Sequence, residues 1–301
     1  MDRAGTRAPV PVICIGNVTV GGSGKTPTAI HVAALLRSMG RSPAFLTRGY
    51  GGRLAGPVLV DAARHGFAEV GDEALLLSRH APTIVSRHRP AGAALAASLG
   101  ADVIVMDDGL QNPSLAKDLS VAVFDGAVGT GNGLPIPAGP LRAPLGAQWP
   151  KIDAVLVLGG GEPGERIAAE AMSRNIPVLR GGLRPDHEAA ARLQGRRVLA
   201  FAGIGRPEKF FESLGEIGAE VVQTRSFPDH HAYVEREILA LLDSAAQATL
   251  TPVTTEKDFM RLIGFAATEP RIAAIGLLPV SLVLHEDAPL QPLLERALSR
   301  T

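Results

Sequence analysis

The chain has 301 residues, which is enough for about two domains of ordinary size. Its 30 Lys and Arg residues balance 30 Asp and Glu residues, which excludes a strongly basic nucleic-acid-binding surface and an acidic tail. A hydrophobic content of 46% with 20% charged residues excludes long disordered stretches. The single cysteine, Cys14, excludes a disulfide framework, and the apolar run around it predicts a buried thiol.

The apolar runs are too short for a membrane span, which needs about 18 consecutive apolar residues. Residues 272–284 come closest, but Gly276, Pro279 and Ser281 interrupt them. The first residues lack the charged-then-apolar order of a signal peptide. We therefore predict neither a spanning helix nor a secretory signal.

Short β-branched runs alternate with Ala- and Leu-rich stretches through the first half of the chain. Strands are predicted at residues 10–15, 44–46, 83–85, 103–106, 121–124 and 154–158, and helices at 28–39 and 92–99. Fully apolar strands separated by helices are typical of a mostly parallel sheet with helices on both faces. The class predicted is therefore α/β.

The second half begins with a new α/β unit near residue 197. Strands are predicted at 198–202, 220–223 and 250–253, with Pro207 opening a helix. The polar stretch 184–194 separates this unit from the first, so we predict a larger domain over 1–190 and a smaller α/β domain over 191–301. Between residues 126 and 150 Gly, Pro and Asn predict a long loop over the end of the first sheet, and loops of that length are usually functional or disordered.

A glycine-rich segment lies between the first predicted strand and the first predicted helix: Thr19, Val20, Gly21, Gly22, Ser23, Gly24, Lys25 and Thr26. This is the setting of a phosphate-binding loop, whose glycines let backbone N–H groups surround phosphate oxygens at a helix N-terminus. Lys25 would contact the β- and γ-phosphates of ATP, and the Thr26 hydroxyl would hold Mg²⁺. The usual pattern begins with Gly where this chain has Thr19, and the alternative is a glycine-rich turn with a solvated lysine.

Two acidic residues, Asp107 and Asp108, end the predicted strand 103–106. A buried strand that ends in acid is where a P-loop protein places the carboxylate associated with Mg²⁺. The alternative is a turn, since Asp-Gly favours turns. The sequence does not say which carboxylate lies nearer the ion.

Three polar segments admit two interpretations each. Asp72 opens a helix, where it is either a functional carboxylate or an N-cap. His230 and His231 are adjacent in a loop; their side chains should diverge, so one His working with a carboxylate is as plausible as a surface loop and a shared metal is disfavoured. The basic stretch from Arg79 to Arg89 is either a solvated face or an anion site.

These segments together resemble the tetraacyldisaccharide 4'-kinases, the lipid A 4'-kinases, over about residues 9–284. The resemblance rests on an ordered set of motifs: Gly16-Asn17, the glycine-rich loop with Pro27, Thr47-Arg48-Gly49-Tyr50-Gly51-Gly52, Gly71-Asp72-Glu73, Asp107-Asp108-Gly109-Leu110-Gln111, Gly131-Asn132-Gly133-Leu134-Pro135, Pro137-Ala138-Gly139-Pro140-Leu141-Arg142, Ala202-Gly203-Ile204-Gly205, Asp229-His230 and Thr255-Glu256-Lys257-Asp258.

The resemblance implies transfer of the ATP γ-phosphoryl group to the 4'-hydroxyl of a tetraacylated glucosamine disaccharide 1-phosphate, with Mg²⁺. It implies Asp72 as the base that accepts the hydroxyl proton and His230 as its partner, beside Lys25. Since Asp72 and His230 fall in different predicted domains, their site would lie in a cleft that closes.

A cytoplasmic protein, peripheral on the cytoplasmic face of the inner membrane, is also implied. Exposed apolar side chains would contact lipid, aided by arginine, for which Arg79, Arg87 and Arg89 are candidates. No nucleic acid and no obligate protein partner are indicated.

Three departures from the family pattern stand out. Asn112 occupies the place of a usual His, and Ala143 that of a usual Glu. The hydrophobic segment that usually precedes the first strand is shorter here.

Two other functions fit a P-loop. A GTPase-like switch needs a guanine-reading Asn-Lys-x-Asp, but Lys151-Ile152-Asp153 follows Pro150 and precedes its strand, which disfavours it. An ATP-sensing regulator without lipid kinase activity would not require a base, so the need for Asp72 in turnover separates it from a kinase.

Overall fold

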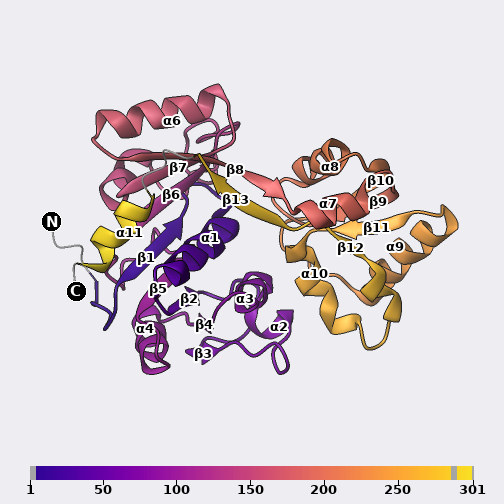
Figure 1. Ribbon diagram of the computed structural model, residues 1–301, viewed down its shortest axis with the longest axis horizontal. Coiled ribbons are helices and arrows are strands. Elements are labelled where there is room, and N and C mark those ends of the chain that lie inside the picture. The colour runs from indigo at the N-terminus through magenta and orange to yellow at the C-terminus, as the bar shows by residue number, and fades with distance from the viewer. Residues whose placement is uncertain (1–4, 286–289, 300–301) are drawn as a thin grey trace.

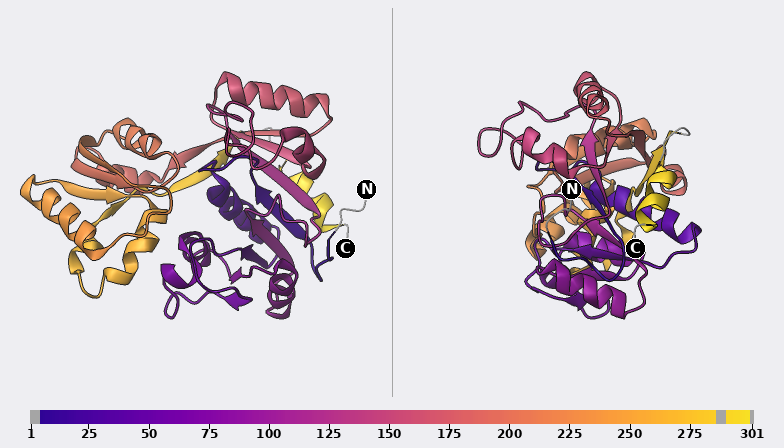
Figure 2. Two further views of the ribbon diagram at one scale, coloured as in Figure 1. Left: turned by 180° about the vertical axis from the view of Figure 1, so that it is seen from behind. Right: turned by 90° about the vertical axis from the view of Figure 1, so that its left-hand side faces the viewer.

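The computed structural model describes residues 5–285 and 290–299. Two α/β lobes lie side by side, and two long strands join them (Figure 1). Figure 2 shows the same two lobes from behind and from one end. The lobes are described in turn because the candidate site draws on both.

The larger lobe is built on a nine-stranded sheet. Its strands are β1 (Val12–Gly16), β2 (Pro43–Thr47), β3 (Val58–Leu59), β4 (Thr83–Val85), β5 (Val103–Asp107), β6 (Leu119–Asp125), β7 (Ala154–Leu158), β8 (Val178–Pro185) and β13 (Val280–Leu284). They lie in the order β13-β8-β7-β6-β1-β5-β2-β4-β3. All inner neighbours pair in parallel, and only the edge strands β13 and β3 are antiparallel.

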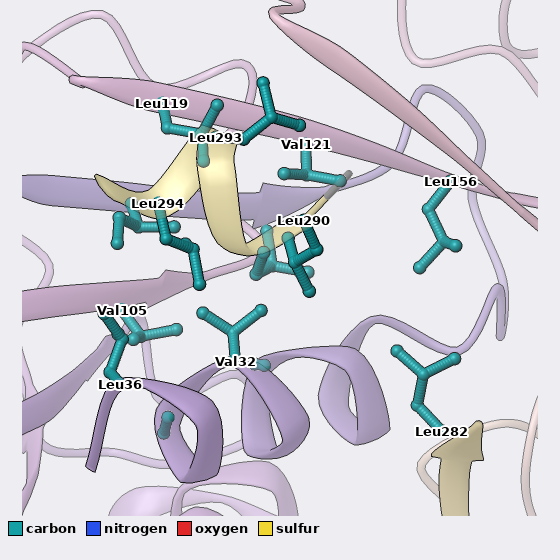
Figure 3. Close-up of a cluster of buried hydrophobic side chains, with 14 of the residues drawn as sticks. Val32, Leu36, Val105, Leu119, Val121, Leu156, Leu282, Leu290, Leu293 and Leu294 are labelled. Atoms are coloured by element: carbon teal, nitrogen blue, oxygen red, sulfur yellow. The ribbon is translucent and has the colours of Figure 1, made fainter. Parts of the chain in front are cut away.

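Helices cover both faces of this sheet, which confirms the predicted class. They are α1 (Lys25–Ser38), α2 (Phe67–Val70), α3 (Asp72–Ser78), α4 (Arg89–Ser98), α5 (Leu145–Gln148), the 3₁₀ turn η1 (Trp149–Lys151), α6 (Glu162–Ser173) and α11 (Leu290–Leu298). On one face, Val32 of α1 and Leu294 of α11 pack with strand residues such as Val105 and Val121 (Figure 3). On the other face, α4 and α6 cover a second core that holds Cys14.

Two glycines and a proline lie at the helix ends that the sequence predicted. Gly40 and Gly100, each just after a helix, have φ of +78° and +91°, a left-handed backbone that favours glycine. Pro207 stands in the first turn of its helix, where its missing N–H costs nothing. The predicted helix over 28–39 in fact starts at Lys25, because the glycine-rich segment runs directly into it.

The smaller lobe has a four-stranded parallel sheet in the order β10-β9-β11-β12. Its strands are β9 (Arg197–Ala202), β10 (Glu220–Ser226), β11 (Thr251–Thr254) and β12 (Gly276–Leu277). Its helices are α7 (His187–Leu193), α8 (Pro207–Glu216), α9 (Glu235–Gln247), α10 (Glu256–Leu262) and the 3₁₀ turns η2 (Ile263–Phe265) and η3 (Pro270–Ala274).

The end of the chain returns to the larger lobe. β13 pairs with β8 from Gly181 to Pro185, and α11 packs into the core beside α1. The smaller sheet therefore takes only the part of 191–301 up to about Leu277, whereas β13 and α11 add to the first lobe. The local sequence of neither β8 nor β13 predicts that these two distant strands pair in antiparallel orientation. The polar stretch 184–194 is the end of β8 followed by α7, and β8 and β13 together form the connection between lobes.

The long loop 126–150 lies over the carboxyl end of the large sheet, as predicted, and holds the start of the glycine-rich loop. The backbone N–H of Val20 donates to the carbonyl of Pro140 at 2.8 Å. The N–H of Arg142 donates to the carbonyl of Val18 at 2.9 Å. This loop therefore fixes the path of the chain as it leaves β1.

Candidate active site

The glycine-rich segment lies between the carboxyl end of β1 and the N-terminus of α1, as a phosphate-binding loop does. Gly24 has φ of +84°, and a Cβ there would lie 2.4 Å from a methyl carbon of Leu158, so only glycine fits. A Cβ on Gly21 or Gly22 would meet nothing within 4 Å, which leaves their backbone open to a ligand. Lys25 is the first residue of α1 and is 8% exposed.

Two of the three predicted metal ligands, Asp107 and Asp108, lie beside this loop at the end of β5, and the third, Thr26, is on α1. The Thr26 hydroxyl donates to Asp107 Oδ2 at 3.3 Å, and Lys25 Nζ lies 4.0 Å from Asp108 Oδ2. Burial raises the pKa of Asp107 to about 7, with further contributions from the nearby charges of Glu73 and Asp108. One oxygen of each Asp, Oδ1, is buried without a hydrogen-bond partner. Each carboxylate therefore keeps one buried oxygen that could accept a ligand.

Arg142 is a site residue to which the sequence assigned no role. It comes from the long loop, donates to the Thr19 carbonyl at 3.0 Å and pairs with Asp108 Oδ2 at 2.8 Å. Its place in the Pro-Leu-Arg motif of the family was the available signal. It joins the loop, the acidic pair and the phosphate-binding segment.

Asp72 and His230, 158 residues apart in the chain, are in contact. His230 Nδ1 lies 3.3 Å from Asp72 Oδ1 and 3.2 Å from Oδ2. The Asp72 side chain is wholly buried, whereas that of His230 is 19% exposed and lines the cavity. The N-cap alternative fits less well, because Gly71 occupies the cap position and Asp72 is the first residue of α3, although Asp72 Oδ1 also accepts the Glu73 N–H at 2.9 Å.

Lys257, on α10, completes this contact between the lobes. Its Nζ lies 3.2 Å from His230 Nε2 and 3.1 Å from Glu73 Oε1. Because an ammonium group only donates, Nε2 accepts, and Nδ1–H then donates to Asp72. Burial works against the charge of Lys257, but the carboxylates of Glu73, Asp72 and Asp229 raise its pKa.

The charge state of Asp72 follows from its surroundings. Burial alone would raise its pKa, but the hydrogen bond from His230 and the nearby cations Lys257 and Arg261 outweigh burial and lower it. Asp72 is therefore a buried carboxylate that stays ionised at neutral pH.

The other polar residues singled out in the sequence do not join this contact. His231 points away from His230 and binds Glu237 Oε2 at 2.9 Å, so the two histidines diverge as expected. Arg79 and Arg87 are exposed. Arg89 is only 3% exposed, so its interpretation as part of a lipid-facing surface is wrong. Its Nη1 bonds the carbonyl of Ser86 inside the fold.

A cavity of about 670 Å³ lies between the lobes. This volume lies in the range of small-molecule sites. From the larger lobe it is lined by residues 20–27, Asp107, Asp108 and Arg142. From the smaller lobe it is lined by Gly205, Arg206, Lys209, His230 and Lys257. One wall thus carries the phosphate-binding loop, and the other carries the histidine of the buried pair.

Comparison with known proteins identifies the family. The profile of tetraacyldisaccharide-1-P 4'-kinase matches residues 2–299. The chain belongs to this kinase family. A tetraacyldisaccharide 4'-kinase of Methylobacterium sp. (strain 4-46) is 63% identical over 287 residues, 95% of this chain and 84% of the relative. That of Bradyrhizobium sp. (strain BTAi1) is 51% identical over 299 residues, 99% of this chain and 87% of the relative.

A solved member of the kinase family has the same fold. LpxK from Aquifex aeolicus, crystallised in complex with ATP, superposes with a TM-score of 0.72 at 25% identity. The match covers 98% of this chain and 90% of that structure. The family resemblance expected from the motifs is thereby confirmed.

The two substitutions against the family pattern lie off the cavity wall. Asn112 Oδ1 accepts hydrogen bonds from the backbone and hydroxyl of Ser114, which closes a local turn. The carbonyl of Ala143 accepts a hydrogen bond from Gln148 Nε2 at 2.8 Å. Neither residue is among the described residues that line the cavity.

Proposed function

We propose that this chain transfers the γ-phosphoryl group of ATP to the 4'-hydroxyl of a tetraacyldisaccharide 1-phosphate, the lipid A precursor. Family membership and the ATP complex of the related LpxK support the reaction. The observation that carries it is the meeting of Asp72 and His230 across two lobes, opposite a phosphate-binding loop. Neither a GTPase-like switch nor an ATP sensor needs this pair.

In this proposal residues 19–26 hold the phosphates of ATP, and Lys25 contacts the β- and γ-phosphates. The domain division keeps the predicted units 1–190 and 191–301, except that β13 and α11 belong with the first. In this proposal the second unit closes over ATP, and the contact between Asp72 and His230 already joins the two units.

The buried pair provides the base. Asp72 has no exposed surface, so a substrate hydroxyl in the cavity meets His230 first. We assign Asp72 the role of the ionised acceptor and His230 that of the group that orients it and relays the proton. The hydroxyl would take the place of Lys257 at Nε2, while Lys257 keeps its bond to Glu73. The hydroxyl oxygen, freed of its proton, attacks the γ-phosphorus in line with the departing ADP.

The direct test is labelled phosphoryl transfer. Purified protein is incubated with γ-labelled ATP, Mg²⁺ and a detergent-dispersed tetraacyldisaccharide 1-phosphate, and labelled lipid is separated by chromatography. Labelled lipid that depends on both substrates supports the proposal. Turnover of ATP without labelled lipid, or no turnover at all, contradicts it.

Mg²⁺ fits the residues at the end of β5, because hydroxyl and carboxylate oxygens are its preferred ligands and two of these oxygens are buried without partners. Thr26, Asp107 and Asp108 would hold it. When bound, it neutralises charge on the phosphates as the γ-phosphoryl group is transferred.

Substitution of the acidic pair is expected to change the metal requirement. Asp107→Asn and Asp108→Asn should each raise the Mg²⁺ concentration needed for half-maximal kcat or abolish turnover, as a titration of rate against Mg²⁺ would measure. Asn suits position 108 because its φ is +51°, which Asn tolerates. Asp102→Asn, at the far end of β5, is the matched control. Full activity in excess chelator would rule the metal site out.

The membrane contact remains a proposal for a chain in which none of the described helices is long and apolar enough to cross a bilayer. Leu134 and Ile136 are 49% and 54% exposed on the loop that pairs with the phosphate-binding segment. We propose that they touch lipid near the mouth of the site, with exposed arginines such as Arg79 and Arg87 aiding at anionic lipid.

Sedimentation with anionic liposomes at low ionic strength tests this contact. The wild-type protein should bind, and the double variant Leu134→Ser/Ile136→Ser should bind less because apolar burial is lost. Met172→Ser, which removes an exposed apolar side chain from α6, should bind like wild type. Wild-type protein that stays in the supernatant would refute peripheral binding altogether.

A further inference from the structure

Arg261 lies at the centre of the contact between the lobes, behind the wall of the cavity. It is on α10, one turn after Asp258, and its side chain has no exposed surface. It is not among the described residues that line the cavity. A guanidinium this deeply buried needs charge and hydrogen-bond partners on every nitrogen, since an unpaired buried charge is strongly destabilising.

Each nitrogen of Arg261 has a different partner. Nε lies 3.1 Å from Asp72 Oδ2, close enough for an ion pair but without the alignment of a hydrogen bond. Nη1 donates to the carbonyl of His231 at 2.9 Å, and Nη2 donates to that of Gly203 at 2.9 Å. Nη2 also pairs with Asp258 Oδ1 at 2.9 Å.

These partners surround His230 as well as Asp72. The Gly203 carbonyl that accepts from Arg261 also accepts the backbone N–H of His230 at 3.1 Å. His231, whose carbonyl Arg261 binds, is the next residue along the chain. Arg261 thus contacts the carboxylate of one lobe and, in the other lobe, two carbonyl groups that hold the backbone of its histidine partner.

We propose that Arg261 is a positioning residue that sets the distance and charge state of the Asp72–His230 pair. The inference rests on the proposed function, in which that pair accepts the hydroxyl proton. Arg261 keeps Asp72 ionised before the reaction, so that this carboxylate is free to accept the proton that His230 relays from the hydroxyl. Lysine cannot replace it fully, because one ammonium group cannot occupy the three nitrogen positions of the planar fork at once.

The charged groups that face Asp72 come from three segments, and all bear on its titration. They are Glu73 of α3, Asp229 and His230 of the loop after β10, and Lys257, Asp258 and Arg261 of α10. Among them His230, Lys257 and Arg261 oppose protonation of Asp72. Removing the Arg261 charge should therefore make the pair take up a proton at higher pH, and the acidic limb of the rate profile should move in that direction.

The experiment compares Arg261→Met, Arg261→Lys and Tyr233→Phe in the full chain. Tyr233 donates to Asp258 Oδ1 at 2.7 Å and stacks against Arg261, but it does not reach Asp72. Its substitution disturbs the same buried network and serves as the structural control. For each variant kcat, the KM for ATP, the pH dependence of kcat and the thermal midpoint are measured.

Arg261→Met is expected to lose roughly 10²-fold in kcat, since a small misplacement of reacting groups costs about that much, with little change in the KM for ATP. Its acidic limb should move to higher pH, whereas Arg261→Lys keeps the limb and recovers part of kcat. Tyr233→Phe should lower the thermal midpoint without moving the limb. A folded Arg261→Met with wild-type kcat and profile overturns the proposal.

If Arg261→Met does not fold, Arg261→Lys decides: reduced kcat with an unchanged KM for ATP supports positioning, and wild-type kcat overturns it. Asp72→Asn, measured beside these variants, distinguishes failure of the proposed base from failure of the role proposed for Arg261. If Asp72→Asn keeps full activity, the proposed base is wrong. If Asp72→Asn is inactive but Arg261→Met is not, only the role of Arg261 fails.

Discussion

Lys25→Ala is expected to lower kcat by about 10²- to 10³-fold, the usual cost of removing one preorganised contact to charge that develops in the transition state. Lys25 is nearly buried at the start of α1, and its one ion pair with a described residue is a long one, to Asp108 Oδ2 at 4.0 Å. Its ammonium group is therefore available to phosphate oxygens rather than tied up in the fold. Steady-state rates of labelled-lipid formation measure the effect.

Two controls make this result specific to the phosphate contact. Lys151→Ala removes an exposed lysine from η1 and should leave kcat unchanged. A thermal melt of Lys25→Ala checks that the variant is folded, so that a loss of kcat reports the phosphate contact. Turnover of Lys25→Ala close to wild type would end the assignment of residues 19–26 as a phosphate-binding loop.

The second large effect is expected at the Asp72–His230 pair. Asp72→Ala and His230→Ala should each reduce kcat strongly, and the double variant should lose little beyond the worse single variant, because members of one unit are not additive. ATP affinity should change little in any of the three, since neither residue belongs to the phosphate-binding loop. A double-variant cycle of kcat, with ATP binding measured separately, tests this.

Neighbouring residues supply the controls for the pair. His231→Ala removes a histidine that binds Glu237 rather than Asp72, so its kcat should stay near wild type. Asp72→Asn keeps much of the ability to cap a helix while it removes the charge. A stable Asp72→Asn with normal kcat would leave Asp72 a merely structural residue, and additive losses in the double variant would indicate two separate jobs.

Much of the fold was predictable because its signals are local. Apolar runs such as that at β5 mark strands buried on both faces, and glycines such as Gly40 and Gly100 mark where helices end. The glycine-rich loop is recognisable for the same reason, since a strand, a turn and a helix N-terminus are consecutive in the chain. The ordered set of motifs then indicated the kinase family, and the comparisons confirmed it.

The chain by itself therefore determined the class of fold, the place of the glycine-rich segment between β1 and α1, and the family. The tertiary structure decided which distant segments meet. It returned β13 and α11 to the first lobe, buried Arg89, and placed Arg261 against Asp72. These outcomes depend on pairings between residues far apart in sequence, where the free energy comes from shared burial and charge neutralisation rather than from any local pattern. In the sequence Arg261 cannot be told from a solvated arginine on a helix, because its carboxylate partner, Asp72, is far away in the chain.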